Sequence, residues 1–120
     1  MIVVALVDPG IPFAVKFPPG VHVVPWPADV SPSEPFKVIV DRKATVVHFC
    51  CMELDDARAT LVKRIRRWKQ VGTVLSTHEG IADCSCDTWH ALDSDTPSFV
   101  QAYNYAGLGD LKELLNVKEI

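Results

Sequence analysis

The sequence of 120 residues lacks the long apolar runs and the strong charge of one sign that would take it out of the soluble globular class. No apolar run approaches the length of about twenty residues that a membrane-spanning helix needs. The apolar N-terminus has no basic region before it, and Asp8-Pro9-Gly10 ends it early, so a signal peptide is not expected. The net charge of −3 gives no overall attraction to nucleic acid or to anionic lipid. These absences predict a cytoplasmic protein with neither membrane nor nucleic acid as a partner.

The composition is that of one ordinary folded domain. Hydrophobic residues make up 48% and charged residues 22% of the chain, which is enough to build a core. At this length a single domain over residues 1–120 is expected. The four cysteines form two close groups, and in a reducing compartment we expect them to be thiols.

The first part of the chain, residues 1–51, is expected to be rich in β-structure. Eight of the nine prolines lie in the first 35 residues, and they separate short apolar segments. The stretch from Pro25 to Pro35 is too rich in proline for regular strand pairing and is predicted to be a loop. Because the connections look short, the strands are expected to form an antiparallel meander of four to six strands. The predicted strands cover residues 2–7, 12–17, 21–26, 36–40 and 45–50, with a hairpin at Asp41-Arg42-Lys43.

The second part, residues 52–120, is expected to be mainly helical, which gives the α+β class. One long amphipathic helix is predicted because apolar residues recur at spacings of three and four and because Gly72 would end it. A short strand over 71–76 is predicted after it, followed by short helices over 86–92, 96–107 and 111–115. The apolar face of the long helix is expected to hold Leu54, Ala57, Leu61, Ile65 and Trp68.

Cys86 is the first candidate for chemistry. Ser85 could cap a helix that begins at Cys86, and a helix N-terminus lowers the pKa of a thiol. A cysteine nucleophile also needs a base, which is usually a histidine. His48, in the strand before the long helix, is the preferred base. The alternative is that Cys84 and Cys86 are small buried side chains without a role in chemistry.

The segment from Glu53 to Leu92 resembles part of the circularly permuted, papain-like NlpC/P60-related cysteine hydrolases. The resemblance rests on an acidic start and an aromatic end of the long helix, followed by Asp83-Cys84-Ser85-Cys86-Asp87-Thr88-Trp89. It implies that Cys86 is the nucleophile, that Trp89 is a packing aromatic, and that an amide or thioester bond is hydrolysed. The glycine and histidine that the family places at an early strand have no counterpart in residues 2–7. The resemblance therefore also admits an inactive relative.

Two other patterns leave further interpretations open. His78, Cys84, Cys86 and His90 offer nitrogen and sulfur ligands for zinc, although their spacing differs from that of familiar zinc sites. The basic residues of 63–69 are interpreted as a solvated helix face rather than a phosphate-binding surface. No cofactor is expected.

A non-enzymatic function is the competing hypothesis. The protein would then be a small structural or interaction protein, such as a phage or prophage assembly component or an adaptor. Loops that project from a rigid scaffold commonly carry binding functions. The loop from Pro25 to Pro35 is accordingly the expected contact with a protein partner, and Trp26 within it is expected to be exposed.

Overall fold

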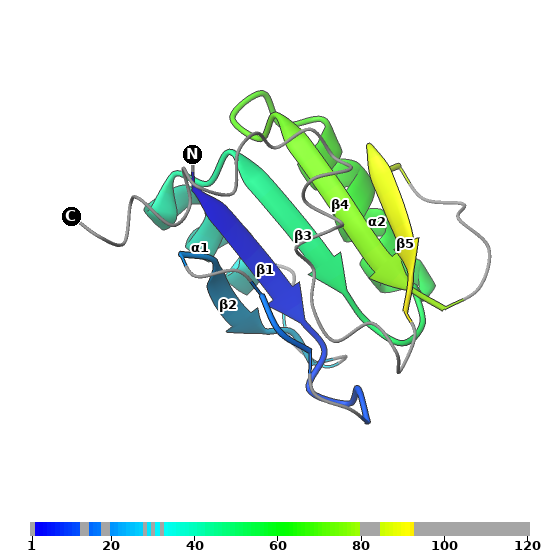
Figure 1. The fold of residues 1–120 in the computed structure, drawn as a ribbon. Coiled ribbons are helices and arrows are strands. Elements are labelled where there is room, and N and C mark those ends of the chain that lie inside the picture. The colour runs from blue at the N-terminus through cyan, green and yellow to red at the C-terminus, as the bar shows by residue number, and fades with distance from the viewer. Residues whose placement is uncertain are drawn as a thin grey trace.

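In a computed structural model, the chain folds into a five-stranded sheet in which every pair of neighbouring strands is parallel (Figure 1). The strand order is β2-β1-β3-β4-β5. The structure describes residues 2–12, 15–17, 20–27, 29, 31, 33–79 and 85–92. The elements are β1 (Val3–Val7), β2 (His22–Pro25), α1 (Ser33–Arg42), β3 (Val46–Cys50), α2 (Asp56–Arg66), β4 (Thr73–His78) and β5 (Thr88–Ala91).

The expected α+β fold with an antiparallel meander is wrong, because the protein is an α/β domain with a parallel sheet. Helices α1 and α2 connect β2 to β3 and β3 to β4, so they form the crossovers that parallel strands require. Helices and strands alternate on both sides of residue 52, and β4 and β5 follow the long helix.

The central strands are buried because both of their faces are covered. All five residues of β3 are buried, as are the first four of β1. Such continuous apolar runs are typical of parallel sheets, whereas an antiparallel sheet with one wet face alternates apolar and polar residues. The segments predicted over 2–7, 21–26, 45–50 and 71–76 are thus confirmed as strands, with small shifts at their ends.

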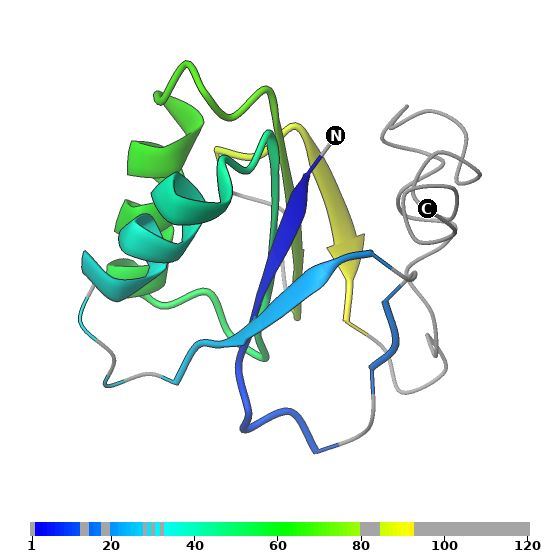
Figure 2. The same ribbon diagram turned by 90° about the vertical axis from the view of Figure 1, so that its left-hand side faces the viewer.

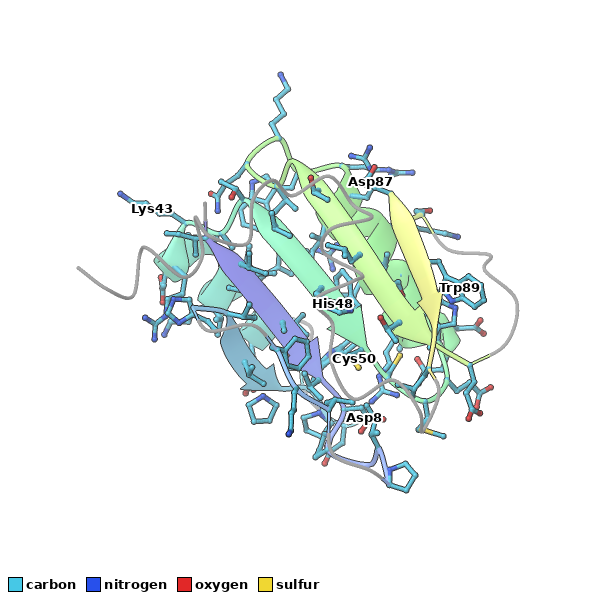
Figure 3. All side chains as sticks on the ribbon, viewed as in Figure 1. Asp8, Lys43, His48, Cys50, Asp87 and Trp89 are labelled. Carbon is cyan, nitrogen blue, oxygen red and sulfur yellow. The ribbon has the colours of Figure 1, made fainter. Side chains whose placement is uncertain are left out.

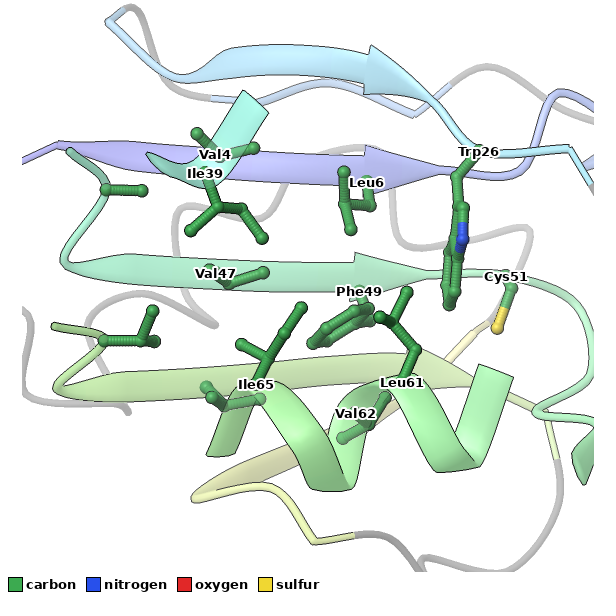
Figure 4. Close-up of a cluster of buried hydrophobic side chains, with 13 residues drawn as sticks. Val4, Leu6, Trp26, Ile39, Val47, Phe49, Cys51, Leu61, Val62 and Ile65 are labelled. Carbon is green, nitrogen blue, oxygen red and sulfur yellow. The ribbon is translucent and has the colours of Figure 1, made fainter. Parts of the chain in front are cut away.

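Two apolar layers lie on the two faces of the sheet. Both helices cover one face (Figure 2), and Ile39 of α1 and Leu61 and Ile65 of α2 pack there against strand residues such as Phe49 (Figure 4). The other face is covered by the connection between β1 and β2, through Ile11, Val15 and Phe17. Among the described residues of the strand predicted over 12–17, Lys16 forms a single β-bridge and no strand is found, so that prediction is wrong for them.

Helix α1 replaces the strand predicted over 36–40 and the hairpin predicted at Asp41-Arg42-Lys43. Pro35 lies in the first helical turn, where its missing N–H is not needed. The turn after the helix is made by Lys43, whose φ of 55° lies in the left-handed region. Gln70 then donates from Nε2 to the carbonyl oxygens of Ile39 and Ala44, which satisfies backbone groups at this end.

Helix α2 confirms the predicted long helix, but Leu54 and Trp68 of its predicted apolar face lie outside it and Ala57 is exposed. Asp55 caps it by accepting a hydrogen bond from the Arg58 N–H at 2.8 Å. The buried residues are Arg58, Leu61, Val62 and Ile65, so the core-facing side includes an arginine that the apolar pattern had left out.

The helix predicted over 86–92 is wrong, because β5 occupies Thr88–Ala91 and pairs with β4. The helices predicted over 96–107 and 111–115 lie outside the described residues. In the part of the chain that the structure describes, no helix is both long and apolar enough to cross a membrane.

Candidate functional site

The carboxyl ends of β1 and β3 form the topological switch point of the sheet. These strands are neighbours, but the chain leaves β1 over one face toward β2 and leaves β3 over the other face toward α2 (Figure 2). The connections therefore diverge at this edge (Figure 2). In open α/β sheets, ligands bind outside the carboxyl ends of the strands at such a point. The side chains here are the first place to look for function.

Asp8 is the residue that follows β1 at the switch point (Figure 3). Its backbone N–H donates to the Cys50 carbonyl oxygen at 2.9 Å, which continues the pairing of β1 with β3. Its Oδ1 accepts from the Gly10 N–H at 2.8 Å, and its Oδ2 lies 3.1 Å from a guanidinium nitrogen of Arg58. Both carboxylate oxygens are therefore engaged, and the Asp-Pro-Gly turn holds the side chain in place.

Arg58 reaches this edge from the first turns of α2. Only 7% of the residue is exposed, and its guanidinium group contacts three connections at once. Nη2 pairs with Asp8 and donates to the Trp26 carbonyl oxygen at 3.1 Å, while Nη1 lies 3.8 Å from Asp55. The guanidinium carbon also lies 5.0 Å from the centroid of the Trp26 ring, a cation–π distance. One buried side chain thus fastens together the loops that follow β1, β2 and β3.

The Arg58 Nε–H differs from the two terminal nitrogens, which have partners. It is buried and has no hydrogen-bond partner among the residues that the structure describes. An unmade hydrogen bond of this kind costs about 1–3 kcal/mol. The arginine is therefore retained at a cost that a hydrophobic residue at the same position would avoid.

Trp26 is buried, contrary to the expectation that it would be exposed in the loop. It is 3% exposed and packs against Phe49, with ring centroids 5.3 Å apart (Figure 4). The backbone N–H of Trp26 donates to the Val7 carbonyl oxygen at 2.7 Å, so the start of the loop from Pro25 to Pro35 is fixed to the sheet.

Cys50 ends β3 beside Asp8 and Cys51 follows it, but neither is suited to nucleophilic chemistry. Both are fully buried. Burial raises the pKa of each thiol from about 9 to about 12. For Cys51 the charge of Arg58 acts in the opposite direction, but the effect of burial is larger. At neutral pH both side chains are protonated thiols, whereas the thiolate is the nucleophile and the metal ligand.

The turn after β1 and the N-terminus of α2, both described by the structure, lack the features that hold phosphate. The residues after β1 are Asp8-Pro9-Gly10-Ile11-Pro12, without the glycine-rich turn of a dinucleotide-binding loop. The N-terminus of α2, where an anion would bind, is already capped by the Asp55 carboxylate. A nucleotide is therefore a poor fit to this site.

The structure places the predicted catalytic pair in two different surroundings. Cys86 precedes β5 and packs against the apolar layer on the helix side of the sheet. His48 is fully buried on the other side of β3, where its Nε2 lies 2.8 Å from Thr77 Oγ1 and its ring meets Phe17 edge-on. The sheet therefore separates the two side chains.

The local arguments for an activated Cys86 also change. Ser85 caps no helix, because the following element is β5, so Cys86 does not lie at a helix N-terminus. Cys86 is disulfide-bonded, which corrects the expectation of a free thiol. The role of Cys86 and His48 in catalysis stays a prediction, and it would first require reduction of that bond.

The four residues considered for zinc are not gathered in the part of the chain that the structure describes. Asp87, next to Cys86, pairs with Val74 through its backbone N–H, whereas His78 lies four residues farther along β4. That interval corresponds to about 13 Å along the strand. Cys84 and the His90 side chain lie outside the described residues. Among those described, no group of three or more His, Cys, Asp or Glu side chains could hold a metal ion.

Comparison of the chain with protein-family models, curated proteins and solved structures finds no match. Function is therefore argued from the arrangement of residues alone. The central pair, Asp8 and Arg58, was not singled out from the sequence. Its signal was an arginine at the core-facing position that precedes Leu61 and Ile65 by three and seven residues.

Proposed function

We propose that this protein is a non-enzymatic binding module that docks a basic segment of a partner protein on the carboxyl edge of its sheet. The observation that carries the proposal is the buried Arg58 side chain, which joins three loops of this edge through Asp8, Asp55 and the Trp26 carbonyl oxygen. Loops that are already fixed lose little conformational freedom when they bind, so less of the interaction energy is spent on ordering them.

The charge of the edge supports a basic partner. Among the described basic residues of the loops and first helical turns at this edge, Arg58 is buried and paired with Asp8, and Lys16 is exposed in the connection from β1 to β2. Exposed acidic residues follow β2, β3 and β4 along the same edge, and complementary charge steers and orients association. They are Asp29, Glu53, Asp55, Asp56 and Glu79.

The buried thiols support binding over catalysis at this edge. Cys50 and Cys51 are the nucleophilic residue types closest to the switch point in sequence, and burial keeps both protonated. The loop from Pro25 to Pro35, for which the sequence predicts a partner contact, begins at this edge. Asp29 and Ser31 of this loop are exposed, whereas the buried Trp26 holds the start of the loop against the sheet.

A labelled polyarginine peptide, followed by fluorescence anisotropy at low ionic strength, tests the proposal. Asp56→Asn at the edge should weaken binding by about threefold, the size expected for one exposed ion pair. Asp41→Asn is the matched control, because it removes the same charge from an exposed residue of α1 at the opposite end of the helix layer. It should leave the affinity unchanged.

Cys86→Ser provides a second comparison, because a binding module does not need this sulfur. Its affinity for the peptide should equal that of the unmodified protein. Equal losses in Asp56→Asn and Asp41→Asn would mean that the peptide senses only net charge, and the proposed edge would then be wrong.

A further inference from the structure

The outer edge of β2 is one of the two edges of the sheet, and no other described strand pairs with it. β2 pairs with β1 on one side, and β2 is the last strand of the order on its other side (Figure 1). Val23 in the middle of β2 is 53% exposed, and His22 and Pro25 are also exposed. We infer that two copies of the protein associate through this edge, with their β2 strands antiparallel around a two-fold axis at Val23.

The direction of the backbone groups in β2 defines the pairing. The Trp26 N–H donates to the Val7 carbonyl oxygen, so residues of β2 that are an even number of positions from Trp26 face β1. The N–H and C=O groups of Val21 and Val23 consequently point away from the sheet. A second strand placed there would find donors and acceptors at alternate residues.

The position of Pro25 selects the antiparallel pairing centred on Val23. In that register, Val23 faces Val23 of the second copy, and each of the two donates to the other. Val21 faces Pro25 of the second copy, so the Val21 N–H meets the Pro25 carbonyl oxygen. The missing N–H of Pro25 costs only one further bond at each end, which is where proline is tolerated in a strand.

The side chains of this edge do not oppose the approach of a second copy. Residues 20–27 contain no Asp, Glu, Lys or Arg, although each chain carries a net charge of −3. Exposed edge strands of monomeric proteins usually carry such charges, lysine above all, to prevent pairing. Their absence here, together with an exposed valine, favours self-association.

The resulting dimer would continue the sheet from one copy into the other. A two-fold axis perpendicular to the sheet places the helices of both copies on the same face. The contact is short, with two bonds between the Val23 residues and one from each Val21. An interface of this kind is small, so we expect a dissociation constant in the micromolar range or above.

Sedimentation measurements over a range of concentrations test the dimer. The unmodified protein should change from monomer to dimer as its concentration rises from about 10 µM to about 1 mM. Val23→Lys should weaken association by at least tenfold, because the lysine would face its own copy across the axis. Val40→Lys is the matched control, since Val40 is a similarly exposed valine, 47% exposed, on α1.

Cross-linking keeps the test independent of effects on folding. Residues in a hydrogen-bonded antiparallel pair have Cα atoms about 5.5 Å apart, within the range that a disulfide spans. Val23→Cys should therefore form a covalent dimer under mild oxidation, and Val40→Cys should not. A monomeric protein at the highest concentration, or equal cross-linking of both variants, would overturn the inference. Neither result bears on the carboxyl edge, because these substitutions leave its loops unchanged.

Discussion

Replacing Asp8 with asparagine tests whether the Arg58 ion pair holds the carboxyl edge together. Asparagine has nearly the same shape, and its Oδ1 can still accept from the Gly10 N–H. What is lost is the negative charge 3.1 Å from the Arg58 guanidinium group. The arginine, whose side chain is 8% exposed, would then be a buried cation without its nearest counter-charge.

The structure gives the size of this effect. Removing one partner of a buried ion pair costs about 3–5 kcal/mol, because the other charge stays buried. The side chain of Asp8 is 16% exposed, and the Asp55 carboxylate remains 3.8 Å from Arg58, so part of the loss is screened or compensated. We therefore expect Asp8→Asn to lower the free energy of unfolding by about 2–3 kcal/mol.

Urea denaturation at neutral pH measures this loss, with Arg66→Gln as the control. Arg66 and Asp87 form an ion pair of similar length, 2.9 Å, but their side chains are 44% and 33% exposed. Its removal should cost less than about 1 kcal/mol. A double variant, Asp8→Asn with Arg58→Met, should recover part of the stability, since the buried charge is gone. Equal losses in Asp8→Asn and Arg66→Gln would refute the structural role of the pair.

Two further predictions concern buried groups near the end of β3. Because burial raises the pKa of Cys50 and Cys51 to about 12, the unfolded chain loses these protons first above about pH 9. The free energy of unfolding should then fall by up to about 1.4 kcal/mol per pH unit for each thiol. Cys51→Ala should halve this decrease with pH. An equal decrease in both proteins would contradict the burial of the thiols. Thr77→Val removes the buried partner of His48 Nε2 and should cost about 1–3 kcal/mol in a urea titration. Thr60→Val, which loses an exposed hydroxyl bond within α2, should cost less than about 0.5 kcal/mol, and a similar loss in both would count against the His48 contact.

The strands and the long helix could be predicted because their signals are local. Continuous apolar runs mark β1 and β3, and the spacing of Leu61 and Ile65 marks α2. The direction of strand pairing could not be predicted because residues 36–40, which lie in α1, favour a strand. Val38, Ile39 and Val40 are residue types typical of strands. With α1 as a helix, the connection from β2 to β3 is long enough for a parallel crossover.

The candidate site was harder to predict because its members come from distant segments. Asp8 and Arg58 are fifty residues apart, and only the parallel order of β1 and β3 brings them together. Once that order is known, the switch point identifies the edge. The argument that Ser85 caps a helix at Cys86 depended on a helix at 86–92, and the strand β5 found there removes that argument. The catalytic role of Cys86 stays a prediction.

The most direct test of the proposed function is to locate the bound peptide by nuclear magnetic resonance. The backbone amides of the protein are followed in nitrogen-15 spectra while the polyarginine peptide is added. The proposal predicts that shifts concentrate in the loops after β2 and β3, including Asp29, Glu53 and Asp56, and at Glu79 after β4. Shifts concentrated elsewhere, or spread evenly over the surface, would contradict it.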